Sequence, residues 1–144
     1  MMIRRVSGDL AVADQITVED VKQIAEKGFR SIVCNRPDGE AADQPQYAAI
    51  EAAAKAAGLS VQWQPVISGQ LRDEDGAEFA RVVAGLPAPV LAFCRTGTRC
   101  MMLWSLSQAG EKPVEEILAT AQGAGYDLAA LAPRLAALAA SKNA

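Results

Sequence analysis

Residues 90–99 have the sequence VLAFCRTGTR, and this stretch decides the fold. Its first four residues are an unbroken apolar run, which is typical of a strand buried on both faces of a sheet. The apolar side chains of residues 98–109 and the glycine after them predict a helix. A buried strand that passes through a short polar loop into a helix indicates an α/β fold, in which ligands bind at the carboxyl edge of the sheet.

Strand and helix patterns alternate on both sides of this stretch. We predict further strands at 3–6, 10–13, 29–34 and 59–66. One helix begins after Thr17 and ends at Gly28, and the others are predicted at 46–57, 73–84, 113–123 and 126–140, the last broken or restarted at Pro133. The alternation predicts a central, mostly parallel sheet of four or five strands with helices on both faces.

The composition excludes several classes of protein. The 144 residues predict a single domain over 1–144, and a hydrophobic fraction of 51% is enough to form its core. A net charge of −3 argues against a partner held through nucleic-acid phosphates. No apolar run is long enough to span a membrane and no signal peptide is visible, so we expect a cytoplasmic protein with no membrane partner. No sequence feature assigns an oligomeric state.

The chain has no histidine and three cysteines, Cys34, Cys94 and Cys100. The lack of imidazole excludes Ser-His-Asp and Cys-His catalysis and zinc sites with histidine ligands. An odd number of cysteines in a chain expected to be cytosolic argues against a disulfide framework, and their spacing fits no standard zinc site. We therefore expect no metal and no cofactor, and a thiolate activated without histidine becomes the leading candidate for chemistry.

Cys94 stands at the end of the central strand, directly before the polar loop. Inward backbone N–H groups of such a loop form an anion nest, and the start of the following helix adds a positive dipole. These features lower the pKa of a thiol, so we predict Cys94 as the nucleophile and Arg99 as a bidentate oxyanion ligand. The alternative is an inert buried cysteine, but the composition of the loop favours the active site. The residues expected to bind the substrate are Arg95, Thr96, Gly97 and Thr98.

The motif FCRTGTRC resembles the nucleophile loops of rhodanese-type sulfurtransferases and of protein tyrosine and dual-specificity phosphatases. Together with GDLAVADQITVEDV, GFRSIVCNRPDGE and PVLAFCRTGTRCMMLWSL, it resembles the phosphatase-like domain of the beta-lactamase-hydrolase-like protein family over residues 3–135. The resemblance implies a dual-specificity-phosphatase-like fold with a loop of rhodanese length. Because this domain precedes a persulfide dioxygenase domain in some members, the resemblance also implies such a dioxygenase as a partner.

Departures from the phosphatase pattern bear on the reaction. Phe93 stands where phosphatases have histidine, and Cys100 stands where they have the loop arginine. Residues 67–72 contain no carboxylate to serve as the general acid that an alkoxide leaving group needs. Sulfur transfer needs no such acid, because sulfite and thiolates leave readily as anions.

On these grounds the sequence favours a sulfurtransferase that forms a Cys94 persulfide from a small oxyanion or persulfide substrate. The alternative is a phosphatase of the tyrosine or dual-specificity type that forms a Cys94 phosphoenzyme. A third possibility is a catalytically inactive module that binds oxyanions.

Four residues outside the loop are candidates for accessory roles. In the segment NRPDGE, Arg36 is expected to bind an anion and Asp38 to orient Arg36 or Arg99, the alternative being a surface turn. Cys100 is either a packed helix residue or a resolving thiol for Cys94. Asp73 is a candidate general acid, although a carboxylate in the first turn of a helix also suits the helix dipole.

Overall fold

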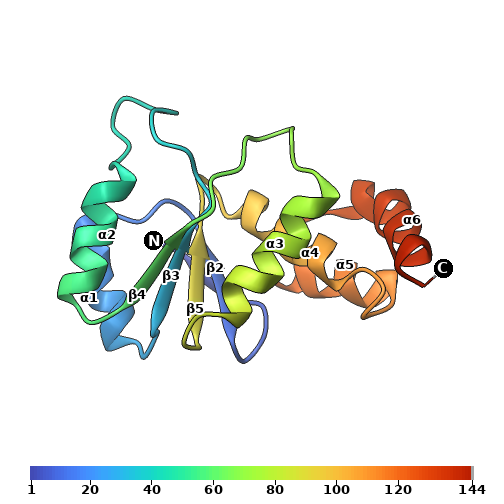
Figure 1. The fold of residues 1–144 in the computed structure, drawn as a ribbon, viewed down its shortest axis with the longest axis horizontal. Helices are drawn as coiled ribbons and strands as arrows, with labels where there is room; N and C mark the ends of the chain where they lie inside the picture. Colours follow the sequence, from blue (N-terminus) through green and yellow to red (C-terminus); the bar gives the residue numbers. More distant parts are fainter. Residues whose placement is uncertain (144) are drawn as a thin grey trace.

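The computed structural model describes residues 1–143 (Figure 1). The strands are β1 (Ile3–Arg5), β2 (Leu10–Ala13), β3 (Ser31–Cys34), β4 (Ser60–Trp63) and β5 (Val90–Phe93). The helices are α1 (Val18–Glu26), α2 (Tyr47–Ala56), α3 (Asp73–Ala84), α4 (Thr98–Gln108), α5 (Val114–Gly123) and α6 (Ala132–Lys142), with a 3-10 turn at Ala129–Leu131.

The five strands form one sheet in the order β1-β2-β5-β3-β4. β1 pairs with β2 in the antiparallel direction, whereas β2, β5, β3 and β4 all run parallel. β5 therefore has a parallel neighbour on each side, and its four residues are fully buried. This arrangement confirms the α/β prediction and the central position of the strand that leads to Cys94.

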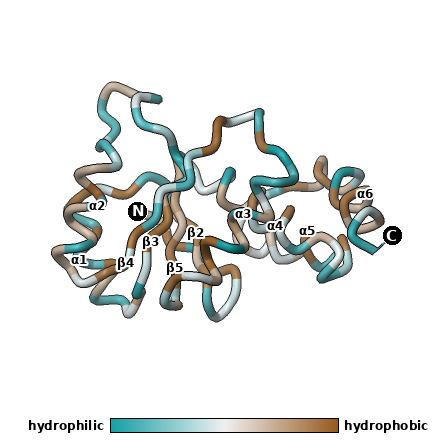
Figure 2. The backbone as a smooth tube through the Cα atoms, in the orientation of Figure 1, coloured by the Kyte–Doolittle hydropathy of each residue, from teal (hydrophilic) through white to brown (hydrophobic). Residues whose placement is uncertain are grey.

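Helices cover both faces of the sheet, as predicted (Figure 1). Leu91 and Phe93 of β5 belong to the core between the sheet and helices α1 and α2. Val90 and Ala92 belong to the core on the opposite face, which includes α4, α5 and α6. Successive side chains of a strand point to opposite faces, so a strand between two helical layers is apolar at every position. Figure 2 shows hydrophobic residues concentrated along the strands.

The observed bounds differ from the predicted ones most at β4 and at the last helix. The strand predicted at 59–66 ends at Trp63, because β4 is an edge strand whose partner β3 offers four residues. Beyond Trp63 the chain makes single hydrogen bonds to the β3 end and then leaves the sheet. The last helix, predicted at 126–140 and broken or restarted at Pro133, begins only at Ala132, after the 3-10 turn at Ala129–Leu131. Pro133 lies in its first turn, where a missing N–H costs no hydrogen bond, so the predicted restart is confirmed.

The parallel strands β3, β4 and β5 end at the same edge of the sheet, at the top of Figure 1. The segments 35–46 and 64–72 rise from this edge on either side of the end of β5. This topology places three segments that are distant in the sequence around one site. Within residues 1–143, no helix is both long enough and apolar enough to cross a membrane.

Candidate active site

Cys94 follows β5 at the carboxyl edge of the sheet, and its side chain is fully buried. Three residues separate it from Thr98, where α4 begins. Gly97 makes this short turn with a φ of 90°, a conformation that side chains disfavour. A Cβ atom at Gly97 would also overlap the hydroxyl of Tyr126. The loop conformation therefore requires glycine at this position.

The start of α4 is directed at the Cys94 sulfur. The backbone N–H of Gly97 donates a hydrogen bond to Cys94 Sγ at 3.2 Å. The pKa of Cys94 is lowered to about 6, chiefly by a hydrogen bond from the Cys100 thiol and further by the backbone N–H groups of Cys100, Arg99 and Gly97, while burial opposes them. A thiol with this pKa is mostly ionised at neutral pH without help from an imidazole.

Arg99 and Arg36 meet at one carboxylate, that of Glu40. Arg99 Nη1 and Nη2 donate to Glu40 Oε2 and Oε1, each at 2.8 Å, and Arg36 Nε donates to Oε1 at 2.9 Å. These bonds lower the pKa of Glu40 to about 2, the bond from Arg99 contributing most. Arg99 Nη1 also donates to the carbonyl of Val66, and Arg36 Nη1 donates to Gln15 Oε1. Both guanidinium groups are thus fixed at the end of the sheet.

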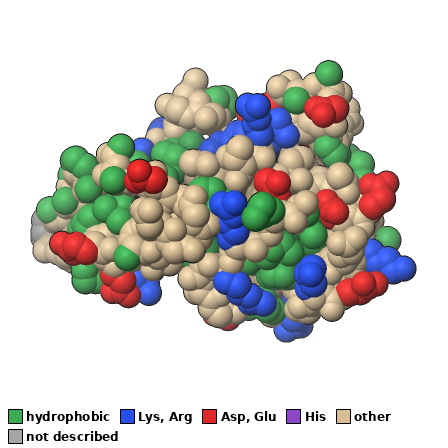
Figure 3. Space-filling model, turned by 180° about the vertical axis from the view of Figure 1, so that it is seen from behind, with side chains coloured by type: hydrophobic (Ala, Val, Ile, Leu, Met, Phe, Trp, Pro, Cys, Tyr) green, Lys and Arg blue, Asp and Glu red, His purple; other side chains and the backbone are tan. Residues whose placement is uncertain are grey.

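A cleft of about 490 Å³ opens above this arrangement. Its lining comes from all three segments at the carboxyl edge, namely Arg36, Glu40, Ala41, Ser68, Arg95, Thr96 and Arg99. In the space-filling view from behind, a group of Lys and Arg side chains lies near the upper edge of the molecule (Figure 3). Three arginines against one glutamate make the cleft electropositive, so it attracts anions despite the net charge of −3.

Tyr126, in the segment between α5 and α6, packs against the loop that follows Cys94. Its hydroxyl donates to the carbonyl of Thr96 at 2.9 Å. Within the loop, Thr96 Oγ1 and Thr98 Oγ1 lie 2.9 Å apart and share a hydrogen bond. The Arg95 and Thr96 backbone N–H groups have no hydrogen-bond acceptor within residues 1–143. These two N–H groups are therefore free to donate hydrogen bonds. The sequence contains no local signal that links Tyr126 to the loop, because thirty positions separate it from Thr96.

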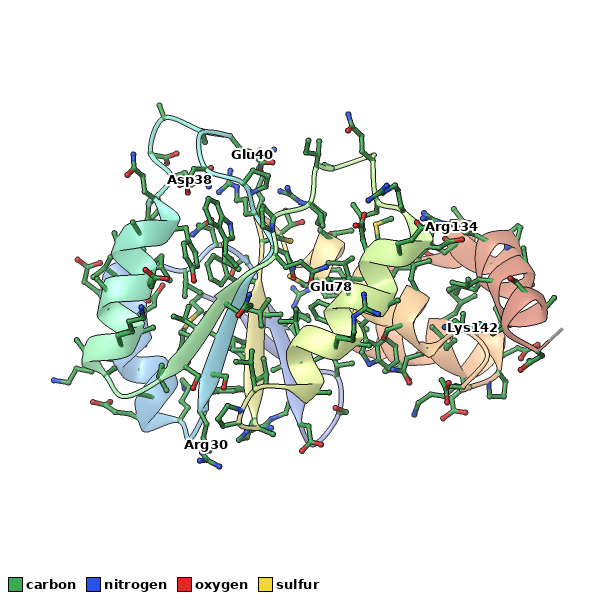
Figure 4. All side chains as sticks on the ribbon, in the orientation of Figure 1. Arg30, Asp38, Glu40, Glu78, Arg134 and Lys142 are labelled. Atoms are coloured by element: carbon green, nitrogen blue, oxygen red, sulfur yellow. The ribbon has the colours of Figure 1, made fainter. Side chains whose placement is uncertain are left out.

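The role expected of Asp38 belongs to Glu40 instead. Asp38 Oδ1 accepts a hydrogen bond from the backbone N–H of Tyr47 at 2.8 Å and so caps α2, whose N-cap residue, Gln46, makes no side-chain cap. Figure 4 labels both carboxylates on the 35–46 segment. The prediction that Asp38 orients an arginine is wrong, and the physical reason is the need of α2 for a capping group. One available signal was the i, i+4 spacing of Arg36 and Glu40.

Asp73 lies in the first turn of α3, where it is paired with a cation. Its Oδ1 accepts from Arg134 Nε at 2.8 Å, and Arg134 Nη2 also donates to the Leu71 carbonyl (Figure 4). Asp75, two residues further along the first turn, accepts from the Arg72 backbone N–H. Both carboxylates therefore stabilise the start of α3, and no contact places either of them at Cys94.

The two remaining cysteines are buried thiols. Burial raises the pKa of Cys100 well above its usual value, and the hydrogen bond to Cys94 adds to this effect. Burial likewise raises the pKa of Cys34 to about 12, and its thiol donates to the Arg36 carbonyl. Within residues 1–143, no group of three or more His, Cys, Asp or Glu side chains is arranged to hold a metal ion.

Comparison with known proteins gives relatives for most of the chain. Residues 2–111 match the family described as "Beta-lactamase hydrolase-like protein, phosphatase-like domain". Proteins named beta-lactamase hydrolase-like protein from Xylella fastidiosa and Agrobacterium fabrum are 36% identical over 130 residues and 32% identical over 128 residues. These alignments cover 89% and 88% of this chain, and the chain spans 30% of the length of each relative.

Solved structures share the fold. A Neisseria meningitidis protein described as a "putative phosphatase" is 38% identical, with a TM-score of 0.87 over 96% of this chain and 99% of that one. Tk-PTP has a TM-score of 0.72 at 15% identity, covering 97% of both chains. TpbA from P. aeruginosa, in complex with pTyr, has a TM-score of 0.70 at 15% identity, covering 98% of this chain and 90% of that one. At such low identity the last two show the fold alone.

These similarities confirm the resemblance and the dual-specificity-phosphatase-like fold that were predicted from the sequence. They support the phosphatase alternative better than the sulfurtransferase that the sequence favoured. Sulfur transfer, which the sequence favoured, gains no support from these matches, whereas a phosphatase-like domain does. The chain belongs to the phosphatase-like domain family of the beta-lactamase hydrolase-like proteins.

Proposed function

We propose that this domain hydrolyses phosphate esters through a phosphoenzyme formed on Cys94. One observation carries the proposal: the backbone N–H groups at the start of α4 and the Cys100 thiol converge on Cys94 Sγ and lower its pKa to about 6. The result is a nucleophile that is ionised at neutral pH, next to an arginine and beneath an electropositive cleft. Membership of a phosphatase-like family supports the same reaction.

In the proposed reaction, Arg99 binds the phosphate group of the substrate. Glu40 and Val66 take hydrogen bonds from its Nη1 and Nη2, and none of these bonds uses Nε–H. The hydrogen bonds to Glu40 are the main cause of the raised pKa of Arg99, and the negative charge of the Cys94 thiolate adds to it. Glu40 is thus a positioning residue that fixes the arginine, while the free backbone N–H groups of Arg95 and Thr96 complete the oxyanion site.

The proposed reaction has two displacement steps at phosphorus. The Cys94 thiolate attacks the phosphorus, a sulfur–phosphorus bond forms, and the ester oxygen leaves with the electron pair of its bond. Water then attacks the phosphorus of the phosphocysteine: an oxygen–phosphorus bond forms, and the sulfur–phosphorus bond breaks with its electron pair returning to Cys94 as the thiolate. The proton of the water leaves with the inorganic phosphate or passes to solvent. Arg99 and the loop N–H groups neutralise the oxygens of the transferring group in both steps.

The carboxylates around the site are engaged in other contacts, and this limits which leaving groups the proposed reaction can release. Glu40 is ionised and held by two arginines, and Asp38, Asp73 and Asp75 are engaged in caps and an ion pair. None of these contacts holds a carboxyl group where it could protonate a departing alkoxide. We therefore propose substrates whose leaving group departs as an anion, such as aryl phosphates or phosphoanhydrides.

Sulfur transfer is the second candidate, and two features favour it. Four residues separate Cys94 from Arg99, as in rhodanese-type loops, and a thiolate or sulfite leaving group needs no general acid. In that reaction the Cys94 thiolate attacks a sulfane sulfur and becomes a persulfide, while the donor leaves as sulfite or a thiolate. A persulfide dioxygenase as the partner that consumes the sulfur belongs to this second candidate.

The test compares Cys94→Ser with Cys34→Ser. We expect 4-nitrophenyl phosphate hydrolysis to fall about a thousandfold or more in Cys94→Ser. Cys34→Ser, a matched buried cysteine at the end of the neighbouring strand, should retain activity within a few-fold. Intact mass after an acid quench should show one phosphoryl group on the wild type and none on Cys94→Ser.

Other outcomes would change the assignment. Turnover of thiosulfate far above that of the aryl phosphate, with one sulfur atom added to Cys94, would replace hydrolysis by sulfur transfer. No adduct with either substrate would leave an inactive module that binds oxyanions. Equal losses in the two serine variants would remove Cys94 from its role as nucleophile.

A further inference from the structure

A second hollow, of about 210 Å³, lies beside the catalytic loop. Its lining consists of Met2, Arg4, Asp14, Arg95, Thr96 and Tyr126. Arg95 and Thr96 also line the active-site cleft, so the two hollows lie on either side of this part of the loop. The reaction proposed above gives no role to Arg4.

Arg4 is held in place by its surroundings. Its guanidinium lies over the ring of Tyr126, with 5.0 Å between Cζ and the ring centroid. The same tyrosine donates its hydroxyl hydrogen bond to Thr96 in the loop. A Cβ atom at Gly125 would stand 2.8 Å from Arg4 Nη1, so the absence of a side chain there makes room for the guanidinium. Arg4 is therefore positioned next to the loop.

The charges of this hollow are less neutralised than those of the cleft. Within residues 1–143, neither Arg4 nor Arg95 lies within 4.0 Å of a carboxylate oxygen, whereas Arg36 and Arg99 share Glu40. The hollow contains one carboxylate, Asp14, whose Oδ1 accepts from the backbone N–H of Met2 at 2.8 Å. Two guanidinium groups against one carboxylate leave a net positive charge in a space large enough for a phosphate group.

We propose that this hollow is an accessory subsite for a second phosphate group, so that the preferred substrates carry two phosphates. The inference rests on the proposed function, because the first phosphate occupies the Cys94 site. Two guanidinium groups match the double negative charge of a phosphate monoester better than the single charge of a carboxylate. Arg95 lies between the two sites and can contact either group.

The test uses aryl phosphates that differ in the second group: 4-nitrophenyl phosphate, 4-carboxyphenyl phosphate and 1,4-phenylene bisphosphate. We expect Arg4→Gln to lower the kcat/KM ratio of bisphosphate to 4-nitrophenyl phosphate about tenfold, mainly through KM. Asp14→Asn should raise the ratio, because it removes the opposing charge. The ratio for the carboxylate substrate should change less than the ratio for the bisphosphate.

Arg5→Gln is the matched control. Arg5 is the neighbour of Arg4 on β1, but its guanidinium lies over Phe29, 5.4 Å from the ring centroid, on the opposite face of the sheet. Its removal should leave the ratio unchanged. An unchanged ratio in Arg4→Gln, an equal loss on all three substrates, or an effect as large in Arg5→Gln would each overturn the proposal.

Binding to Cys94→Ser separates this inference from the proposed function. We expect calorimetry to show tighter binding of 1,4-phenylene bisphosphate than of phenyl phosphate, and we expect Arg4→Gln to remove about tenfold of that preference. If the wild type hydrolyses none of the aryl phosphates but this preference depends on Arg4, the subsite stands and the proposed hydrolysis fails. If hydrolysis occurs without any preference that depends on Arg4, the hydrolysis stands and the subsite fails.

Discussion

Cys34 and Cys94 occupy comparable places at the ends of two neighbouring parallel strands, yet their thiols differ greatly in acidity. In the β3–β5 pairing, Cys34 stands opposite Phe93, one residue before Cys94. Both cysteines are buried, but the pKa of Cys34 is raised to about 12 and that of Cys94 is lowered to about 6. Burial raises both values, so the difference comes from the segment that the chain enters after each strand.

After β5 the chain enters α4 almost at once, whereas after β3 it runs through a long segment before α2. The short connection directs the Cys100 thiol and the N–H groups of the helix start at Cys94. Cys34 instead donates its own proton to the carbonyl of Arg36. A strand end in a parallel sheet is therefore not an active site in itself. The thiol becomes a nucleophile where a helix N-terminus comes directly after it.

The largest expected difference between the two cysteines is in their titration. The thiolate absorbance of the wild type should show a midpoint near pH 6, and this transition should be absent in Cys94→Ser and unchanged in Cys34→Ser. Cys100→Ala removes the main hydrogen-bond donor and should raise the midpoint by about one unit. A wild-type transition near the free value of about 8.5 would contradict the contrast between the two thiols.

The arginines downstream of the two cysteines provide the next comparison. Arg99 makes a bidentate contact to Glu40, whereas Arg36 contacts the same carboxylate through Nε alone. Lysine keeps the charge but loses the planar fork, so Arg99→Lys should lower kcat/KM about ten- to a hundredfold. Arg36→Lys should cost less than about tenfold, measured with the same aryl phosphate. A larger loss in Arg36→Lys would show that the β3 end carries the substrate arginine.

Glu40 joins the two strand ends, and the smallest expected effect concerns stability. Glu40→Gln leaves two buried guanidinium groups without their carboxylate and should lower the free energy of unfolding at pH 7 by about 1–3 kcal/mol. The folded pKa of Glu40 lies near 2, below the usual value of 4.5, so its contribution is complete above about pH 4.5 and is lost as the pH falls toward 2.

Denaturant unfolding at several pH values checks this prediction. The difference between wild type and Glu40→Gln should shrink below pH 4.5. Glu78→Gln is the control, because the Glu78–Arg81 pair is exposed and should contribute little. A difference that stays constant down to pH 2 would mean that the ion pair with the arginines is not its source.

The sequence predicted most of the fold and the loop because their signals are local. The apolar run at 90–93, the glycine at 97 and the helix pattern after it lie within a few residues of one another. The partners across the site were harder to assign. NRPDGE contains two carboxylates, and which of them faces the arginines depends on the turn at Gly39, whose φ is 81°. Asp38 turns toward α2 and Glu40 toward Arg99, and the i, i+4 spacing of Arg36 and Glu40 points to this choice without deciding it.

Tyr126 lies outside residues 2–111, the part of the chain that matches the family, yet its hydroxyl holds the carbonyl of Thr96, thirty positions upstream. A fragment cut at residue 111 would keep every residue of the loop and lose the ring packed beneath Gly97. The stretch matched by the family, residues 2–111, is thus shorter than the stretch that holds the loop, whereas the Xylella fastidiosa relative aligns over 130 residues. An excised or transplanted version of this domain has to extend through the segment between α5 and α6 for the loop to keep its shape.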